Sequence, residues 1–305
     1  MLTDIDVMHI EPFYEPGTGS WTYLLADTAS RVAAIIDPVM VYNPVSGMTD
    51  PAFIDAVRNF AREADYRIDW VLETHAHADH LTAADYLRRR NGAKIACSRG
   101  ICGVQDNFVR VFNLGDEPTD GSQFDRLLDD GDSLYLGALE LRVMATPGHT
   151  NDSVSYLVAD AAFIGDTLFA PRAGTARCDF PGGDAAELFD SVQRLHALPD
   201  DTRLFLCHDY PDDGVEPVCC ITVAESRRAN VHLTQSTPRQ QFVTLRCRRD
   251  AQLDLPRLIL PALQVNIRAG APPPADRNGV SYLRTPFNRA LSDLLGPGAS
   301  AEKEN

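Results

Sequence analysis

The sequence predicts a layered α/β fold with two β-sheets inside and helices outside, and two observations lead to this prediction. Short apolar or β-rich runs of four to seven residues, each ending in a polar residue, Gly or Pro, are typical of buried strands. These runs come first on their own and then alternate with segments of helical periodicity, in two roughly similar halves. The 305 residues are 44% hydrophobic and 23% charged, which are ordinary values for a globular chain.

The runs predicted as strands are, in chain order, 22–25, 32–36, 70–73, 139–145, 154–158, 162–165 and 203–207. The segments predicted as helices are 50–64, 81–90 and 184–198. The first of these has a Pro near its first turn, and the second ends at the stop signal Asn91-Gly92. The third has Leu188, Val192 and Leu195 on one stripe, as expected for a helix with one buried face.

The chain is expected to form a main domain over residues 1–230 and a C-terminal extension over 231–305 that packs on the same domain. Within the extension, 256–269 is predicted as an amphipathic or buried stretch. The Pro- and Gly-rich segment 270–279 is predicted as an ordered loop or strap. The small, polar residues 296–305 are predicted as a frayed end.

The charge of the chain excludes some classes of partner. Asp and Glu number 43 against 28 Lys and Arg, which gives a formal net charge of −15. Such a body repels phosphate backbones and anionic lipids, so we expect no nucleic acid and no membrane as partner. A small anionic substrate would therefore need a local basic pocket.

Cytoplasm is the expected location. The first twelve residues carry neither a signal-peptide nor a transit-peptide pattern, and no apolar run approaches the ~18 residues of a membrane span. The seven cysteines are scattered and odd in number, which is typical of reduced thiols. The sequence leaves the oligomeric state open and is compatible with a homodimer.

The strongest chemical signal is the segment 74–80, Thr-His-Ala-His-Ala-Asp-His, directly after the strand that ends at Glu73. Three imidazoles and one carboxylate crowded at a strand end would leave many lone pairs without a partner. A divalent metal satisfies such lone pairs, and His and Asp are suitable ligands for zinc or iron. The segment therefore predicts a metal site that includes His75, His77, Asp79 and His80.

Further ligands are expected at later strand ends, and three side chains occupy such positions. His149 follows Gly148 after one strand, Asp166 follows Gly165 after another, and His208 follows a third. Taken alone, each has an ordinary structural explanation as a turn, a helix cap or a surface histidine. Their shared position after buried strands favours one metal site.

This pattern resembles that of the metallo-β-lactamase fold superfamily: His-x-His-x-Asp-His, then a His after Gly, an Asp after Gly and a late His. All seven positions are filled, by His75, His77, Asp79, His80, His149, Asp166 and His208. The resemblance runs from Trp21 to about His208. It implies an αββα sandwich of two mixed sheets with helices outside, with residues 1–230 as the catalytic domain and the metal site at one edge of the sheets.

The flanking segments resemble the persulfide (sulfur) dioxygenases of this superfamily and their bacterial β-lactamase-hydrolase-like relatives. These segments are 145–151, 153–157, 164–168, 174–180, 206–210, 222–225 with the following Arg228 and Asn230, and 258–266. The block Arg177-Cys178-Asp179-Phe180 discriminates best. Glyoxalase II enzymes share the His cluster but are not expected to carry that block.

The resemblance implies one Fe²⁺ per chain, held by His75, His149 and Asp166, with open positions for a persulfide sulfur and for O2. It implies that glutathione persulfide is oxidised to sulfite and glutathione. The remaining four side chains would orient the ligands and tune the iron. In the alternative, a glyoxalase II-like thioester hydrolase with two Zn²⁺ ions, they form the second metal site: His77, Asp79, His80 and His208.

Asp79, His208 and Tyr210 are the predicted catalytic residues. Tyr210 is also predicted to bind substrate, by donating its hydroxyl into the site; alternatively, it has only a packing role. Arg177 and Asp179 complete the predicted substrate-binding set. Arg177 offers a cation to the glutathione carboxylates. Alternatively, it pairs with Asp179 or Asp166 and shapes its loop.

Overall fold

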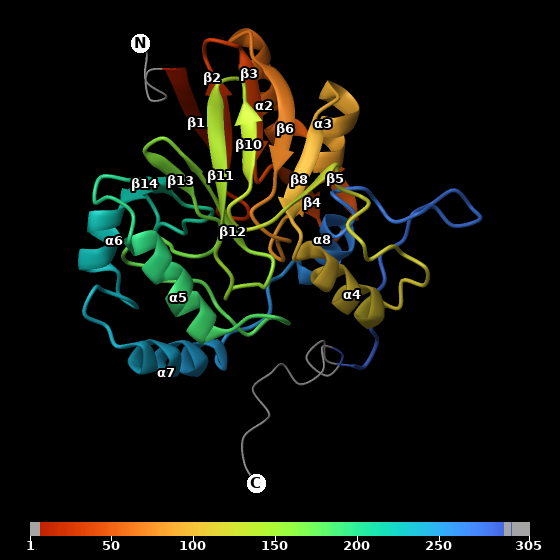
Figure 1. Cartoon of the computed structure of the whole chain (residues 1–305). Helices are drawn as coiled ribbons and strands as arrows, with labels where there is room; N and C mark the ends of the chain where they lie inside the picture. Colours follow the sequence, from red (N-terminus) through yellow and green to blue (C-terminus); the bar gives the residue numbers. More distant parts are fainter. Residues whose placement is uncertain (1–6, 290–293, 295–305) are drawn as a thin grey trace.

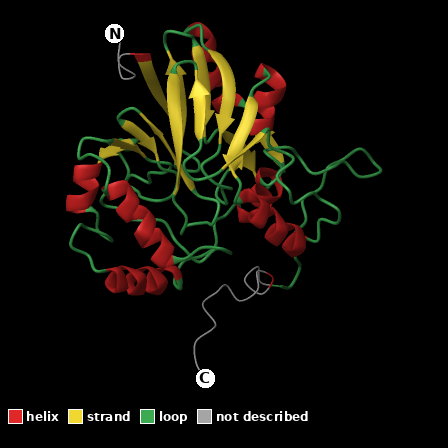
Figure 2. Ribbon diagram, viewed as in Figure 1, coloured by secondary structure: helices red, strands yellow, loops and turns green. Residues whose placement is uncertain are grey.

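Two six-stranded sheets lie face to face between two groups of helices in the computed structural model, which describes residues 7–289 and 294 (Figure 1). Helices α5, α6 and α7 lie on the left of the view and α3, α4 and α8 on the right. Figure 2 shows the same layers by type, with helices red outside the yellow strands. The predicted αββα sandwich is confirmed, whereas the predicted frayed end, 296–305, lies outside the described residues.

Both sheets are mixed, as predicted. The first has the order β1 (Met8–Glu15), β2 (Ser20–Asp27), β3 (Val32–Ile36), β6 (Arg67–Leu72), β8 (Lys94–Ser98), β9 (Arg126–Leu128). It is antiparallel from β1 to β3 and parallel from there on. The second has the order β10 (Ser133–Leu136), β11 (Leu139–Ala145), β12 (Val154–Val158), β13 (Ala161–Phe163), β14 (Arg203–Phe205), β15 (Cys220–Thr222). Only its β13–β14 pair is parallel.

A small third sheet and the helices complete the described fold. The small sheet has the order β5 (Met48–Asp50), β4 (Val39–Asn43), β7 (Leu81–Thr82). The helices on the side of the first sheet are α2 (Ala52–Glu63), α3 (Ala84–Asn91), α4 (Ile101–Phe112) and α8 (Ile259–Asn266). Those on the side of the second sheet are α5 (Ala185–His196), α6 (Val223–Ala229) and α7 (Arg239–Asp250).

The core has three apolar layers because successive side chains of a strand point to opposite faces of its sheet. Leu24 of β2 packs between the first sheet and its helices, whereas its neighbour Leu25 packs between the two sheets. Leu204 of β14 joins the third layer, under α5 and α7, and its neighbour Phe205 faces the first sheet. Strands buried on both faces give the uninterrupted apolar runs from which they were predicted.

One predicted helix begins later than expected. Residues 81–90 were assigned to a single helix, but α3 begins only at Ala84, because Leu81 and Thr82 pair with Met40 and Val39 as strand β7. The apolar spacing of the segment fits a helix, and the pairing with β4 overrides it. This pairing fixes the C-terminal end of the loop formed by residues 73–80, called here the His-rich loop.

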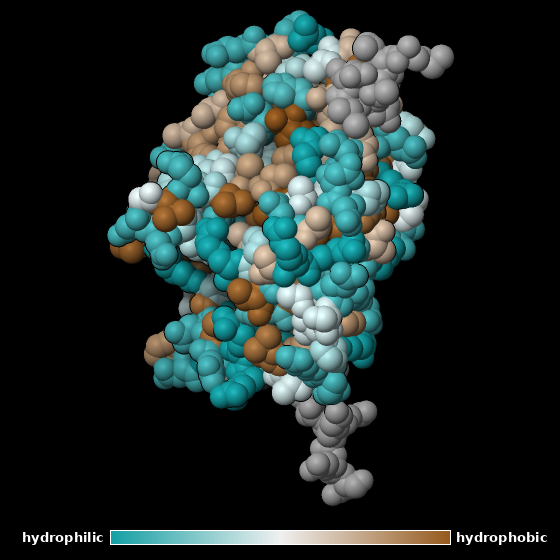
Figure 3. Space-filling view, turned by 90° about the vertical axis from the view of Figure 1, so that its left-hand side faces the viewer, coloured by the Kyte–Doolittle hydropathy of each residue, from teal (hydrophilic) through white to brown (hydrophobic). Residues whose placement is uncertain are grey.

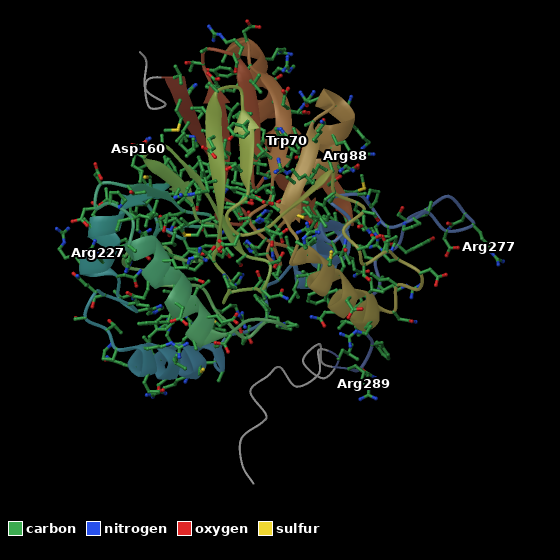
Figure 4. All side chains as sticks on the ribbon, in the orientation of Figure 1. Trp70, Arg88, Asp160, Arg227, Arg277 and Arg289 are labelled. Atoms are coloured by element: carbon green, nitrogen blue, oxygen red, sulfur yellow. The ribbon has the colours of Figure 1, made fainter. Side chains whose placement is uncertain are left out.

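The C-terminal extension packs on the main body through its helices. α7 contacts α5, and α8 contacts α4 and β7. The Pro- and Gly-rich segment follows α8 as a loop closed by a bridge between Ala275 and Ser281, and Arg277 lies at its outer end (Figure 4). The domain boundary at residue 230 stays a prediction.

The surface is mixed in character. On the face that lies on the left of Figure 1, hydrophilic residues predominate and hydrophobic ones are scattered among them (Figure 3). In the described part of the chain, no helix is both long and apolar enough to cross a bilayer.

Candidate metal centre

The strand ends bring the predicted ligands together in space. His75, His149 and Asp166 form one buried group whose donor atoms lie within 4.8 Å of one another. Asp166 Oδ2 lies 3.8 Å from His75 Nε2 and 3.6 Å from His149 Nε2. Such separations are close to those of donors that share one ion at bond lengths of about 2.0–2.2 Å.

A second group lies beside the first, formed by His77, Asp79, His80 and His208. His208 connects the two groups, because its Nε2 lies 3.1 Å from Asp79 Oδ2 and 3.4 Å from Asp166 Oδ1. All seven predicted positions therefore lie at one place. Their assignment to one ion or two stays a prediction.

The chemistry of these groups fits a divalent metal. Five donor atoms of the centre are buried without a hydrogen-bond partner among the described residues: His75 Nε2, His77 Nδ1, His80 Nε2, Asp166 Oδ1 and His208 Nε2. A buried polar atom without a partner costs about 1–3 kcal/mol, so five in one place point to a ligand that satisfies them. Imidazole and carboxylate donors suit both iron and zinc.

The other ring nitrogens are held by the protein, which orients each imidazole. His149 Nδ1 donates to the carbonyl oxygen of Arg177 at 2.7 Å, and His75 Nδ1 lies 3.1 Å from the hydroxyl of Thr74. His77 Nε2 lies 3.0 Å from Asp37 Oδ1. These contacts leave the opposite nitrogen of each ring facing the centre, as metal-binding histidines require.

Asp37 is a buried carboxylate of the centre that the sequence analysis missed. Besides His77, it accepts hydrogen bonds from the Thr74 amide at 2.8 Å and the Thr74 hydroxyl at 2.9 Å. It follows β3 directly, so it has the same strand-end position as the predicted ligands. A signal was therefore present, although a single Asp without neighbouring His or Cys does not stand out.

The electrostatics of the centre favour the neutral form of two of its imidazoles, His75 and His77, which can then donate lone pairs. Burial lowers the pKa of His75 and of His77 well below the usual value, and neighbouring imidazoles add to the effect. Burial raises the pKa of Asp79, but His208 and His80 outweigh it and hold that pKa well below its ordinary value. Neutral imidazoles and ionised carboxylates are the forms that bind metal.

Two glycines are required next to ligands because a side chain would not fit. At Gly148, which has a φ of +131°, a Cβ atom would lie 2.2 Å from the backbone nitrogen of Leu188. At Gly165, with a φ of +51°, it would lie 2.7 Å from the hydroxyl of Thr74. The Gly-His and Gly-Asp pairs of the sequence thus allow His149 and Asp166 to approach the centre.

A cleft of about 530 Å³ opens onto the centre. Asp79, His149 and Asp166 line it, together with Tyr210, whose ring stacks on that of His208 with 5.7 Å between centroids. Arg177 also lines the cleft, so three of the predicted catalytic or substrate-binding residues reach it directly. Asp179 is not among the lining residues.

Arg177 has all three of its guanidinium nitrogens in hydrogen bonds. Nε and Nη2 donate to the two carboxylate oxygens of Asp179 at 2.6 and 2.7 Å, and Nη1 donates to the carbonyl oxygen of Asp254 at 2.6 Å. The guanidinium also lies over the ring of Phe180, 4.9 Å from its centroid. Arg177 therefore ties its own loop, which holds His149, to the segment after α7.

The C-terminal extension places three arginines on the cleft that the sequence analysis did not identify, and one of them, Arg246, is buried and pairs with Asp250. The other two, Arg249 and Arg257, are exposed and make no ion pair or side-chain hydrogen bond with any residue in the described ranges. Cys178, next to Arg177 in the sequence, is buried, and burial raises the pKa of its thiol, which disfavours the reactive thiolate.

Comparison with known proteins gives the family context. A family model described as the metallo-beta-lactamase superfamily matches residues 19–208. The chain is 48% identical to a probable metallo-hydrolase of Burkholderia pseudomallei, over 92% of this chain and 99% of that protein. It is 47% identical to a beta-lactamase hydrolase-like protein of Agrobacterium fabrum but spans only 65% of that protein's length.

Further relatives are named either as a glyoxylase or as a persulfide dioxygenase. The chain is 41% identical to glyoxylase B2 of Dictyostelium discoideum, over 92% of this chain and 97% of that protein. It is 32% identical to the mitochondrial persulfide dioxygenase ETHE1 of Homo sapiens, over 87% and 90%. The crystal structure of ETHE1 from Myxococcus xanthus superposes with a TM-score of 0.70 at 31% identity, covering 87% of this chain and all of that one. The resemblance inferred from the sequence is confirmed.

Proposed function

The chain belongs to the metallo-β-lactamase superfamily, and on that basis we propose that it is a persulfide dioxygenase with one Fe²⁺ per chain. The observation that carries the proposal is the buried group of two imidazoles and one carboxylate, His75, His149 and Asp166. This donor set is typical of non-haem iron oxygenases. The sequence identity of 31–32% to the ETHE1 proteins, over 87% of this chain and 90% or more of theirs, supports the assignment.

The proposed reaction converts glutathione persulfide, O2 and water into glutathione, sulfite and two protons. The terminal sulfur loses its bond to the glutathione sulfur and gains three oxygens, two from O2 and one from water. O2 accepts the four electrons that this sulfur gives up. Fe²⁺ held by His75, His149 and Asp166 would offer open coordination positions to the persulfide sulfur and to O2.

The chain's own residues shape the space around the reacting sulfur. Phe180 lies edge-on to His149, with 5.5 Å between ring centroids, and Phe169 lies 6.3 Å from the ring of His208. Both phenylalanines line the cleft, so they give it an apolar wall beside the centre. Tyr210, on the open side, is placed to contact the incoming substrate.

His208 and Asp79 are proposed to hold and move a proton beside the reacting atoms. Burial lowers the pKa of His208, but Asp166 and Asp79 outweigh it and raise that pKa above its ordinary value. His208 Nε2 also contacts Asp166, so the same side chain orients a proposed iron ligand.

Arg249 and Arg257 are proposed to bind the carboxylates of the glutathionyl group. In a chain of net charge −15, an anionic substrate needs such local cations. Arg177 lines the same cleft, but its hydrogen-bonding groups are engaged with Asp179 and Asp254. We therefore propose that Arg177 mainly supports the loop.

Arg249→Gln and Arg257→Gln are each expected to raise KM for glutathione persulfide with little change in kcat. Loss of one exposed charge-assisted contact should lower kcat/KM on the order of 10-fold, which corresponds to about 1.4 kcal/mol. Steady-state kinetics at low ionic strength measure this. Arg248→Gln is the matched control, because it removes the same charge from α7 at a residue that does not line the cleft. Equal effects of all three substitutions would contradict a specific site.

A thioester hydrolase with two Zn²⁺ ions is the second candidate. It is favoured by the second donor group, in which His77, His80 and His208 each have a buried ring nitrogen without a partner in the described residues. The identity to glyoxylase B2 supports it too.

Metal analysis of the purified protein separates these two functions. We expect about one equivalent of iron per chain and, after anaerobic loading with Fe²⁺, no second equivalent. Two equivalents of zinc together with hydrolysis of S-lactoylglutathione would overturn the dioxygenase assignment in favour of the hydrolase.

We also propose that the protein acts in the cytoplasm. All seven cysteines lie in the described residues and none forms a disulfide. Free thiols of this number are typical of a reducing compartment.

A further inference from the structure

Asn266, the last residue of α8, makes two hydrogen bonds to the His-rich loop and one to strand β7, which directly follows the loop. Its Nδ2 donates to the carbonyl oxygens of His77 and His80, both at 2.8 Å. Its Oδ1 accepts from the amide of Thr82 at 2.9 Å. The side chain is buried, and it comes from the C-terminal extension, beyond the residues that match the family model.

The loop depends on such contacts because residues 73–80 form no strand or helix. Buried backbone groups need partners, and without a sheet ladder they find them in side chains. Asp37 holds the amide of Thr74, and Asp152 holds the amide of Ala76 at 2.9 Å. Asn266 is the side chain that holds the second half of the loop, from which Asp79 and His80 project.

The helix that carries Asn266 is itself anchored away from the loop. Its apolar residues, among them Ile259 and Leu263, belong to the core under the first sheet. Just after it, the carbonyl oxygen of Ile267 accepts from Gln105 at 2.8 Å, and Arg268 pairs with Glu117 at 2.8 Å. A side chain that acts from a fixed helix can set the position of a loop accurately.

We propose that Asn266 is a positioning residue of the metal centre. It fixes the backbone between His77 and His80 so that the side chains of this segment face the centre. The C-terminal extension thereby contributes to the geometry of the metal site, in addition to packing on the domain. The inference rests on the metal centre of the proposed function but not on its reaction.

The test compares two substitutions of similar cost on one helix. Asn266→Leu removes all three hydrogen bonds at nearly constant volume. Gln264→Met is the matched control, because Gln264 is equally buried on α8 and makes its contacts to Leu260 and Arg284 instead of to the loop. Competition with a chelator measures the affinity for Fe²⁺, under anaerobic conditions, and for Zn²⁺.

Asn266→Leu is expected to weaken metal binding on the order of 10- to 100-fold, as for other residues that orient ligands. Both substitutions are expected to lower the unfolding temperature of the metal-free protein by similar amounts. Only Gln264→Met should leave the metal affinity near that of the unmodified protein. Equal metal affinity in the two variants would overturn the proposal. Absence of dioxygenase activity would not, because neither readout uses the reaction.

A measurement on the unmodified protein covers the case in which Asn266→Leu does not fold. If the hydrogen bonds of Asn266 strengthen metal binding, then metal binding must stabilise these hydrogen bonds in turn, because coupling between two sites is reciprocal. We expect Zn²⁺ to slow hydrogen exchange of the Thr82 amide and of α8, with α6 unchanged as the reference helix. Unchanged exchange at Thr82 and α8 would overturn the proposal.

Discussion

Alanine at His75, His149 or Asp166 is expected to abolish Fe²⁺ binding and, with it, oxygen consumption. Each substitution removes one of three donors that lie within 4.8 Å of one another, and two protein ligands are too few to retain the ion. Iron is quantified after anaerobic loading and desalting, beside a melting curve of the metal-free protein. The effect should be near total, because alanine offers no donor atom in place of the one that is removed.

His196→Ala is the matched control for these substitutions. His196 is also a buried histidine, but it lies on α5 and its Nε2 contacts the hydroxyl of Ser226 at 3.0 Å. This variant should lose stability without losing iron. One full equivalent of iron in any of the three ligand variants would show that the ligands are assigned wrongly.

Asp79→Ala and His208→Ala are expected to slow turnover about 10- to 100-fold while substantial iron stays bound. In the proposed arrangement neither side chain is an iron ligand. Asp79 contacts His208, and His208 contacts the proposed ligand Asp166, so their loss disturbs a ligand without removing one. Parallel measurements of iron content and of kcat for each variant test this. The discriminating comparison is with His75→Ala.

The dinuclear alternative predicts the opposite ranking. If His208 and Asp79 hold a second ion, then either substitution should remove metal as completely as His75→Ala does. That outcome would favour two ions and weaken the assignment of one iron.

Strands with a clear burial pattern are the parts of the fold that the sequence predicts best. β3 and β12 begin and end at the predicted residues because they are buried on both faces and their runs have sharp ends. β11 also matches its predicted bounds, because its alternation of buried and exposed residues is itself typical of a strand. β1 was missed because Met8–Glu15 is an edge strand with mixed polar and apolar residues, including Pro12. α7 was missed because Arg239–Asp250 has few apolar residues to show a period.

The same distinction applies to the site. The seven predicted ligands lie where strands end, and their residue types are enough to predict a metal site without knowledge of the fold. Asn266 reaches the loop, and Arg257 reaches the cleft, only because the extension folds back over the main body. Nothing in the local sequence of either residue predicts this position. For Arg177 the sequence left two alternatives, contact with the substrate or a pairing with Asp179 or Asp166, and the structure shows the pairing with Asp179.

Oxygen uptake is the measurement that tests the central claim most directly. Protein loaded with one equivalent of Fe²⁺ is mixed with glutathione persulfide in an oxygen electrode, and sulfite is quantified in the same sample. Uptake of one O2 for each sulfite formed, with none in the His75→Ala variant, is the result that the proposed function predicts. Absence of uptake by the iron-loaded protein, with hydrolysis of S-lactoylglutathione by the zinc-loaded protein, would contradict it.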